Sequence, residues 1–107
     1  MRFPEQWQLL ARGGAQIFAY LTNAVGDAAQ APVWRSHLVS RAAENQRFVL
    51  AANAAHPAQK CPSMIVTPGG SVVWETLSPA GASGQATLDL DAVADWYLSQ
   101  SRRDLCG

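Results

Sequence analysis

Short apolar runs alternate with amphipathic segments along the first half of the chain. Trp7, Leu10 and Ala11 recur at helical spacing after a proline that suits the first turn of a helix. Leu38 and Ala42 mark one face of a second such segment, which also opens on a proline. The expected elements are helices over 4–13 and 32–46 and buried strands over 17–21 and 48–52. Helices that alternate with strands predict an α/β fold built in layers.

The second half of the chain places turn signals between shorter apolar runs. Pro-Gly-Gly-Ser at 68–71 separates two runs rich in β-branched residues, which predicts a hairpin. The expected elements are strands over 63–67, 72–77 and 85–89 and a closing helix over 90–100. Val93, Trp96 and Tyr97 are expected to be the side chains of this helix that pack inward.

Composition narrows the class of protein. The 107 residues fit a single domain over 1–107, and the eight basic and eight acidic side chains cancel. No basic stripe is present, so neither nucleic acid nor an anionic membrane is expected as a partner. The apolar runs are too short to span a bilayer, and no apolar segment follows Arg2 as it would in a secretory signal. A soluble, cytoplasmic protein is the expectation.

The two cysteines, Cys61 and Cys106, are too few for a disulfide framework and are expected to be free thiols. Cys61 follows Lys60, the single lysine, but adjacent residues of an extended segment point in opposite directions. His56 lies five residues away in a proline-bearing loop. Two such ligands do not make a zinc site, so no metal is expected. An activity based on Cys61 or His56 stays a weak alternative, because a thiol nucleophile needs a positioned base.

Four sequence segments occur in a particular order. They are MRFPE at 1–5, RAAENQ at 41–46 after Trp34, SMIVTPGG at 63–70, and ATLDLD at 86–91 followed by RRDL at 102–105. In this order and spacing they resemble the C-terminal part of a nitrilase-superfamily carbon–nitrogen hydrolase. Two positions depart from the pattern: Cys61 falls where the family usually has glycine, and Cys106 falls where it often has tyrosine.

The resemblance implies an α/β fold that is an incomplete half of a four-layer αββα sandwich, with helices packed on a mixed sheet of about four to five strands. It also implies hydrolysis or condensation of non-peptide carbon–nitrogen bonds by a cysteine nucleophile, a glutamate base and a lysine that stabilises the tetrahedral intermediate. By the family order all three lie upstream, the cysteine just before the position matched by Met1. The chain is therefore expected to hold no catalytic residue, cofactor or metal.

The resemblance also assigns roles to residues near the expected site. Arg2 and Glu5 would support the nucleophile elbow, or would form an ordinary ion pair at the start of a helix. Asn23 would lie on the rim of the substrate pocket, because it follows a buried strand, or would form an Asx-turn.

The second helix carries a polar group and an aromatic anchor. Arg41, Glu44 and Asn45 are three and four residues apart, so they can contact one another, either as a buried hydrogen-bonded cluster or as a subunit contact. Trp34 is expected to be a core or interface anchor. In the family, the helices near 4–13 and 32–46 form the main dimer surface, so a homo-oligomer is expected.

Two hypotheses about function follow. In the first, the chain is a truncated carbon–nitrogen hydrolase domain that is inactive alone and acts, if at all, through association. In the second, it is the C-terminal portion of an active amidase or nitrilase that another polypeptide completes. The sequence does not name a substrate for either.

Overall fold

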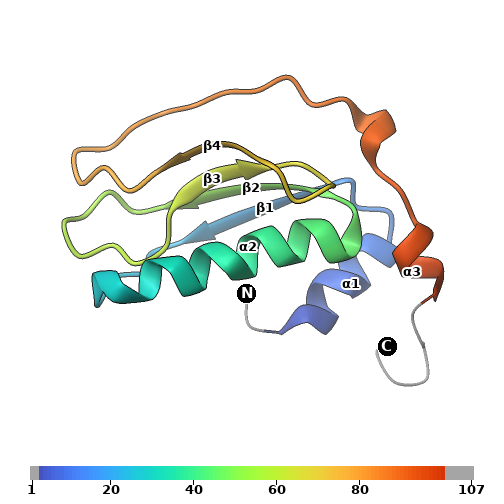
Figure 1. Cartoon of the computed structure of the whole chain (residues 1–107), viewed down its shortest axis with the longest axis horizontal. Coiled ribbons are helices and arrows are strands. Elements are labelled where there is room, and N and C mark those ends of the chain that lie inside the picture. Colours follow the sequence, from blue (N-terminus) through green and yellow to red (C-terminus); the bar gives the residue numbers. More distant parts are fainter. Residues whose placement is uncertain (1–2, 101–107) are drawn as a thin grey trace.

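The structure is a computed structural model, and it describes residues 3–100 of the chain. Four strands form one sheet in the order β1-β2-β3-β4, with the helices on one of its faces (Figure 1). The elements are α1 (Pro4–Arg12), β1 (Ile17–Thr22), a 3-10 turn (Ala28–Gln30), α2 (Ala31–Asn45), β2 (Phe48–Asn53), β3 (Ser63–Val66), β4 (Val72–Thr76), a second 3-10 turn (Leu90–Ala92) and α3 (Trp96–Gln100). The arrangement confirms the expected α/β fold.

The ends of the two long helices follow from local sequence. A proline lies in the first turn of each, where its missing N–H costs no hydrogen bond. Gly13 ends α1, and its N–H donates to the carbonyl of Leu9 at 3.0 Å. Gln46 ends α2 in the left-handed conformation, with φ 54°, which is unusual for a residue other than glycine. The backbone of Gln46 is therefore held by its surroundings, as its contacts below show.

The sheet is mixed. β1 and β2 are parallel and connected through α2, whereas β2–β3 and β3–β4 are antiparallel. The β3–β4 hairpin confirms the prediction from the Pro-Gly-Gly-Ser turn, and Gly70 there has φ +88°, as such a turn requires.

The main core lies between the helices and one face of the sheet. Trp7 of α1 packs edge-on against Phe18 of β1, with 5.0 Å between ring centroids. Leu38 and Ala42 of α2 are fully buried against the same face. The strand residues on this face are Phe18, Val49, Ala51, Met64 and Val66, all buried.

The opposite face of the sheet is also apolar but is only partly covered. Side chains alternate along a strand, so Ile17, Ala19 and Leu21 of β1 point away from the helices. Leu21 is 78% exposed. The expectation that β1 is a buried strand is thus correct for one face and wrong for the other.

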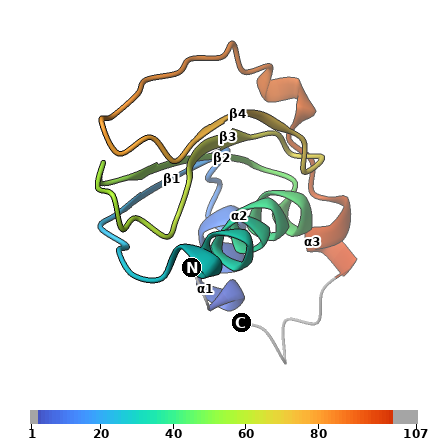
Figure 2. The ribbon, with the colours of Figure 1, turned by 60° about the vertical axis from the view of Figure 1, so that its left-hand side comes forward.

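The segment that follows β4 arcs over this second face (Figure 1, Figure 2). A Cβ on Gly84 would lie only 2.3 Å from the ring of Trp74, which places the segment directly on that ring. The predicted strand over 85–89 does not form, because no strand of the described part lies beside it to complete a ladder. Prediction of a strand there was wrong.

The predicted closing helix over 90–100 is divided in two. After the turn Leu90–Ala92, Val93 is extended because the N–H of Ala94 donates to the carbonyl of Gln46 rather than within a helix. In α3, Trp96 and Tyr97 are 60% and 50% exposed and contact each other, so they do not pack inward as predicted. Leu98 is the buried residue of α3 and belongs to the main core.

No helix within residues 3–100 is long and apolar enough to span a membrane.

Candidate functional site

The carboxyl ends of β1 and β2 lie side by side, because the two strands are parallel and in register from Ile17 to Thr22. Loops leave the sheet at this edge, where α/β folds commonly bind ligands. Asn53, the last residue of β2, joins the loop that follows β1 (residues 23–27) to the loop that follows β2 (residues 54–62). Its Nδ2 donates to the carbonyls of Ala24 (2.9 Å) and Cys61 (2.8 Å), and its Oδ1 accepts from the N–H of Ala24 (2.7 Å). One amide therefore sets the separation of both loops.

Backbone contacts continue this connection. The N–H of Lys60 donates to the carbonyl of Ala24 at 3.0 Å, and that of Gly26 donates to the carbonyl of Ala58 at 2.6 Å. Val25 and Gln59 form an isolated antiparallel bridge. The two loops thus form one ordered rim, although neither belongs to the sheet.

A shallow hollow lies beside this rim at the start of α2. Lys60 places its Nζ 5.1 Å from the centroid of the Trp34 ring, within the range of a cation–π contact. His37 lies edge-on to Trp34, with 6.5 Å between the ring centroids. The cavity measures about 230 Å³ and is lined by Gln30, Val33, Trp34 and His37. The single lysine of the chain is therefore engaged with an aromatic ring of α2.

Asn23 follows β1 at this same edge, and its side chain is exposed. Its predicted contact with a substrate stays a prediction. Asn53, which the sequence pattern did not single out, is the last residue of β2 and lies in register with Thr22, the residue before Asn23. Asn53 is, like Asn23, an asparagine at the end of a strand that is apolar in sequence, so the same pattern could have pointed to it.

Cys61 is fully buried within the core under the rim. Burial raises the pKa of its thiol to about 11, so the thiol is protonated at neutral pH. His56 does not face it as a base: its Nδ1 accepts a hydrogen bond from the N–H of Ala58 at 2.9 Å. A protonated, enclosed thiol without a positioned base is a structural residue.

The structure brings Arg41, Glu44 and Asn45 together on α2. Arg41 Nη1 is paired with Glu44 Oε1, and Asn45 Nδ2 donates to the carbonyl of Arg41 at 2.9 Å. Arg41 and Asn45 are buried, whereas Glu44 is exposed. Burial of two members favours a structural role, and participation of the group in a subunit contact stays a prediction.

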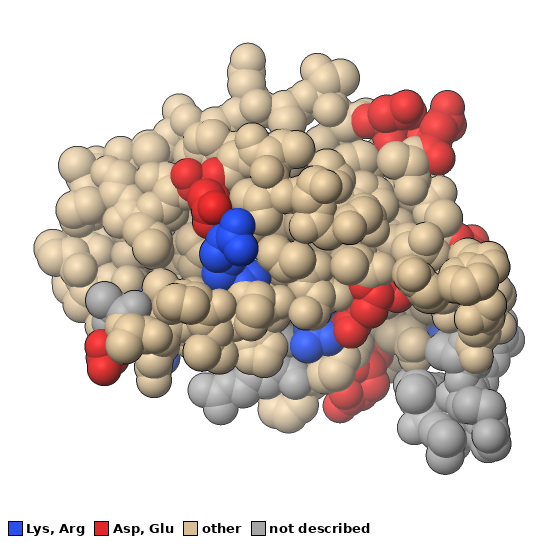
Figure 3. All heavy atoms as spheres, in the orientation of Figure 1, with Lys and Arg blue, Asp and Glu red and all other residues tan. Residues whose placement is uncertain are grey.

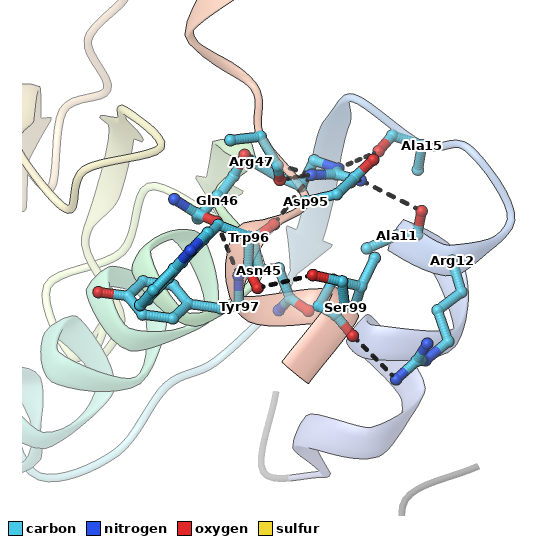
Figure 4. A network of polar contacts seen from close by, with 12 residues as sticks. Ala11, Arg12, Ala15, Asn45, Gln46, Arg47, Asp95, Trp96, Tyr97 and Ser99 are labelled. Atoms are coloured by element: carbon cyan, nitrogen blue, oxygen red, sulfur yellow. Dashed lines mark hydrogen bonds and ion pairs between the residues drawn. The ribbon is translucent and has the colours of Figure 1, made fainter. Parts of the chain in front are cut away.

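Arg47 is a buried arginine that the sequence did not point to (Figure 4). It follows Gln46 and donates to carbonyls from three parts of the chain, those of Ala11 (3.3 Å), Ala15 (2.6 Å), Asn45 (3.0 Å), Gln46 (3.4 Å) and Ala94. Its Nη2 also pairs with Asp95 at 2.6 Å. One guanidinium thus joins the ends of α1 and α2 to the segment before α3.

Two neighbours complete this junction. The Gln46 side-chain oxygen accepts from the N–H of Tyr97 at 3.1 Å, and Arg12 Nη2 donates to the carbonyl of Leu98 at 3.2 Å. These contacts explain why Gln46 adopts its left-handed backbone: in that conformation both its carbonyl and its side chain meet residues 94–97.

The remaining predicted positions divide in two groups. Glu5 lies exposed in the first turn of α1. Arg2, Cys106 and the RRDL segment at 102–105 lie outside the described residues. Among residues 3–100, no three histidine, cysteine, aspartate or glutamate side chains are grouped so as to hold a metal ion.

The sequence profile of the family described as carbon–nitrogen hydrolase matches residues 1–97. This chain belongs to that family. It is 36% identical over 110 residues to human deaminated glutathione amidase, in an alignment that covers 98% of this chain and 32% of the human enzyme. It also resembles the crystal structure of the C. elegans NitFhit protein, with 28% identity and a TM-score of 0.69, over 97% of this chain and 27% of that one.

Both of these proteins are much longer than the matched region. The chain spans about a third of the human enzyme and about a quarter of the C. elegans protein. The fold of this region is the nitrilase-type α/β arrangement, as the resemblance in sequence predicted. The site described above supplies an ordered rim and a helix junction, in which Cys61 is enclosed and Lys60 contacts Trp34.

Proposed function

We propose that this chain is a C-terminal portion of a carbon–nitrogen hydrolase domain that is inactive alone and works by association with the polypeptide that completes the domain. The observation that carries the proposal is the second face of the sheet, where Ile17, Ala19 and Leu21 are apolar and exposed. An apolar face of this kind marks a surface that packs against protein. The relatives have additional chain to cover it.

Inactivity of the chain alone is supported by its two reactive candidates. Cys61 has a thiol whose pKa is raised by burial to about 11, and this leaves almost no thiolate at neutral pH. Lys60 is the single lysine, and its ammonium lies over Trp34 rather than beside the thiol. Catalysis of the family type needs a nucleophile, a base and a group that stabilises the developing charge.

The chemistry proposed for the completed domain is hydrolysis of a non-peptide amide. The support is the human relative, which is named for its action on deaminated glutathione. In this arrangement the Asn53-linked rim would form one wall of the substrate pocket, with Asn23 on its exposed side. The chain would supply shape and binding contacts, and the completing polypeptide would supply the chemistry.

The test compares the chain alone with the chain mixed with the part of human deaminated glutathione amidase that lies outside the match. Hydrolysis of deaminated glutathione is the readout. We expect no turnover by the chain alone and turnover by the mixture above that of the human part alone. A chain with Cys61→Ala and Cys106→Ala should behave as the original in the mixture. Turnover by the chain alone that depends on Cys61 would overturn the proposal.

A second candidate is self-association through α1 and α2, as the family resemblance suggests. Leu9, Leu10 and Val33 are exposed apolar side chains on these helices, and each is more than half exposed. Sedimentation velocity over a range of concentrations tests this. We expect a dimer that Leu9→Glu dissociates and that Leu21→Glu, on the far face of the sheet, leaves intact. A monomer at every concentration would exclude it.

A further inference from the structure

A cation that no carboxylate neutralises lies at the margin of the hollow at the start of α2. Lys60 is the single lysine of the chain, and within residues 3–100 it forms no ion pair. By contrast, Arg35, Arg41 and Arg47 each pair with a carboxylate, and on the face drawn in Figure 3 the large patches of basic atoms adjoin acidic ones. The Lys60 ammonium carries three N–H donors and contacts the face of the Trp34 ring. An anion can therefore bind to Lys60 without displacing a carboxylate of the described residues.

The backbone that carries this lysine is held in place by the rim. The N–H of Lys60 donates to the carbonyl of Ala24 at 3.0 Å, and the side chain of Asn53 donates to the carbonyl of the next residue, Cys61, at 2.8 Å. The lysine stem then passes Gly26, where a Cβ would lie 3.3 Å from Lys60 Cδ, so glycine gives the stem room. An ordered segment thus delivers the ammonium to α2. A ligand that binds there has little ordering of the protein to offset.

A neutral polar group lies close to the ammonium. Lys60 Nζ and the side-chain oxygen of Gln30 lie 3.8 and 3.7 Å from the position that a Cβ on Gly26 would occupy, so both side chains reach the same place. The Gln30 side chain forms no hydrogen bond that caps α2. Its amide offers N–H donors beside the oxygen, and Gln30 also lines the hollow. The amide and the ammonium can therefore donate to the same anion.

The lining of the hollow is largely apolar and aromatic. Its volume is about 230 Å³, and its lining residues are Gln30, Val33, Trp34 and His37. None of these is acidic, and Asp27, which precedes them in the chain, uses its Oδ1 to accept from the N–H of Ala29 at 2.9 Å. Pockets for drug-sized ligands measure about 300 to 1,000 Å³, so this smaller hollow suits a small molecule. The lining favours a ligand that has an apolar body beside its charge.

We infer that the hollow at the start of α2 binds a small organic carboxylate, whose charge meets Lys60 and whose apolar body packs on Trp34 and Val33. A carboxylate fits better than a phosphate, because the site offers one ammonium and neutral donors. Phosphate sites usually combine several backbone N–H groups or the forked donors of arginine. The inference goes beyond the function proposed above and does not depend on it, since every group of the site belongs to this chain.

Titration of the isotope-labelled chain with benzoate, followed by nuclear magnetic resonance, tests the site. Benzamide, a neutral molecule of nearly the same shape, is the matched probe. We expect benzoate to shift the indole N–H of Trp34 and the backbone amides of Gln30 and Lys60. The indole N–H of Trp74, on the other face of the sheet, should not shift. Benzamide should bind about fivefold more weakly or worse, because it lacks the charge that meets the ammonium.

Two variants of Lys60 separate its charge from its stem. Lys60→Gln should lower the affinity for benzoate to about that for benzamide, whereas Lys60→Arg keeps a cation over the ring and should bind benzoate within about twofold of the original chain. Absence of benzoate binding, or equal binding of the two probes by the original chain, would overturn the inference even where a variant fails to fold. Benzoate binding that Lys60→Gln leaves unchanged would also overturn it. None of these results bears on turnover by the completed domain, so the proposed function is tested separately.

Discussion

The two faces of the sheet are made from the same strands, yet only one of them is fully covered by other elements. This is the face toward α1 and α2, named the finished face. On the helix side, Phe18 and Val49 are buried beneath α1 and α2. On the other side, Leu21 extends into solvent, and the cover consists of an irregular segment that contacts Trp74. Strands that are buried on both faces have continuous apolar runs, whereas strands with one wet face alternate. The continuous apolar runs of β1 and β2 are therefore typical of strands in a sheet with both faces covered.

The largest effect is expected at Arg47, which fixes the helix layer that finishes the first face. Replacement by methionine keeps much of the volume but leaves the carbonyls of Ala15 and Asn45 without the donors that Arg47 supplies. Each buried carbonyl that loses its donor costs about 1 to 3 kcal/mol of unfolding free energy, and Arg47 donates to several carbonyls. Urea denaturation followed by circular dichroism would measure the loss. Arg47→Lys, which keeps the charge without the fork of donors, should recover only part of it.

A pair of leucine truncations sharpens the comparison directly. Leu38→Ala opens a cavity in the finished face and should lower the unfolding free energy by about 2 to 5 kcal/mol. Leu21→Ala removes the same atoms from the unfinished face and should change it by less than about 0.5 kcal/mol. Denaturant titrations of both variants at one protein concentration give the difference. Similar losses at the two sites would mean that the second face is already covered in solution.

A smaller and pH-dependent effect is expected at Cys61, which belongs to the core of the finished face. Its pKa is about 11 in the fold against an ordinary value of 9.0, so the unfolded chain loses the thiol proton first as pH rises. The contribution of Cys61 is fully present below about pH 9 and is lost towards pH 11, by roughly 2 to 3 kcal/mol at most. Unfolding free energies measured with reductant should fall more steeply over this window than those of Cys61→Ala. Parallel curves would contradict the assignment.

The sequence predicted most of the elements but not everything that holds them. Strands, helices and the hairpin up to β4 followed from periodicity, glycine and proline, because these signals act within a few residues. The strand expected at 85–89 failed because a strand exists only with a neighbour, and pattern alone does not supply one. Trp96 and Tyr97 were expected inside, but the start of α3 is set by the N–H of Tyr97, which donates to Gln46, and by Arg47, which donates to the carbonyl of Ala94. Leu98 is the residue that points inward instead.

The residues that join distant segments were the hardest to foresee. Arg47 lies between a helix and a strand, where an arginine usually faces solvent; its role depends on carbonyls up to 47 residues away in sequence. Asn53 could have been predicted, because it lies at the end of an apolar strand and Asn23 directly follows one. Arg41, Glu44 and Asn45 were foreseeable as neighbours because helical spacing alone brings them into contact. Local contacts could be predicted, whereas contacts between distant segments required the fold.

The smallest effect is expected at the margin of the finished face, where Glu75 of β4 pairs with Arg35 of α2. The two side chains are joined by hydrogen bonds of 2.8 and 3.1 Å, but each is more than two-fifths exposed. The bond from Arg35 lowers the pKa of Glu75, so the benefit is present above the ordinary pKa of a glutamate and is lost as pH falls through the lowered value. Solvent screening keeps the contribution of such a pair small. Thermal unfolding of Glu75→Gln should therefore differ little from that of the original chain at neutral pH, and the two should converge in acid. A large loss would show that this margin, and not the helix junction, determines how firmly α2 covers the sheet.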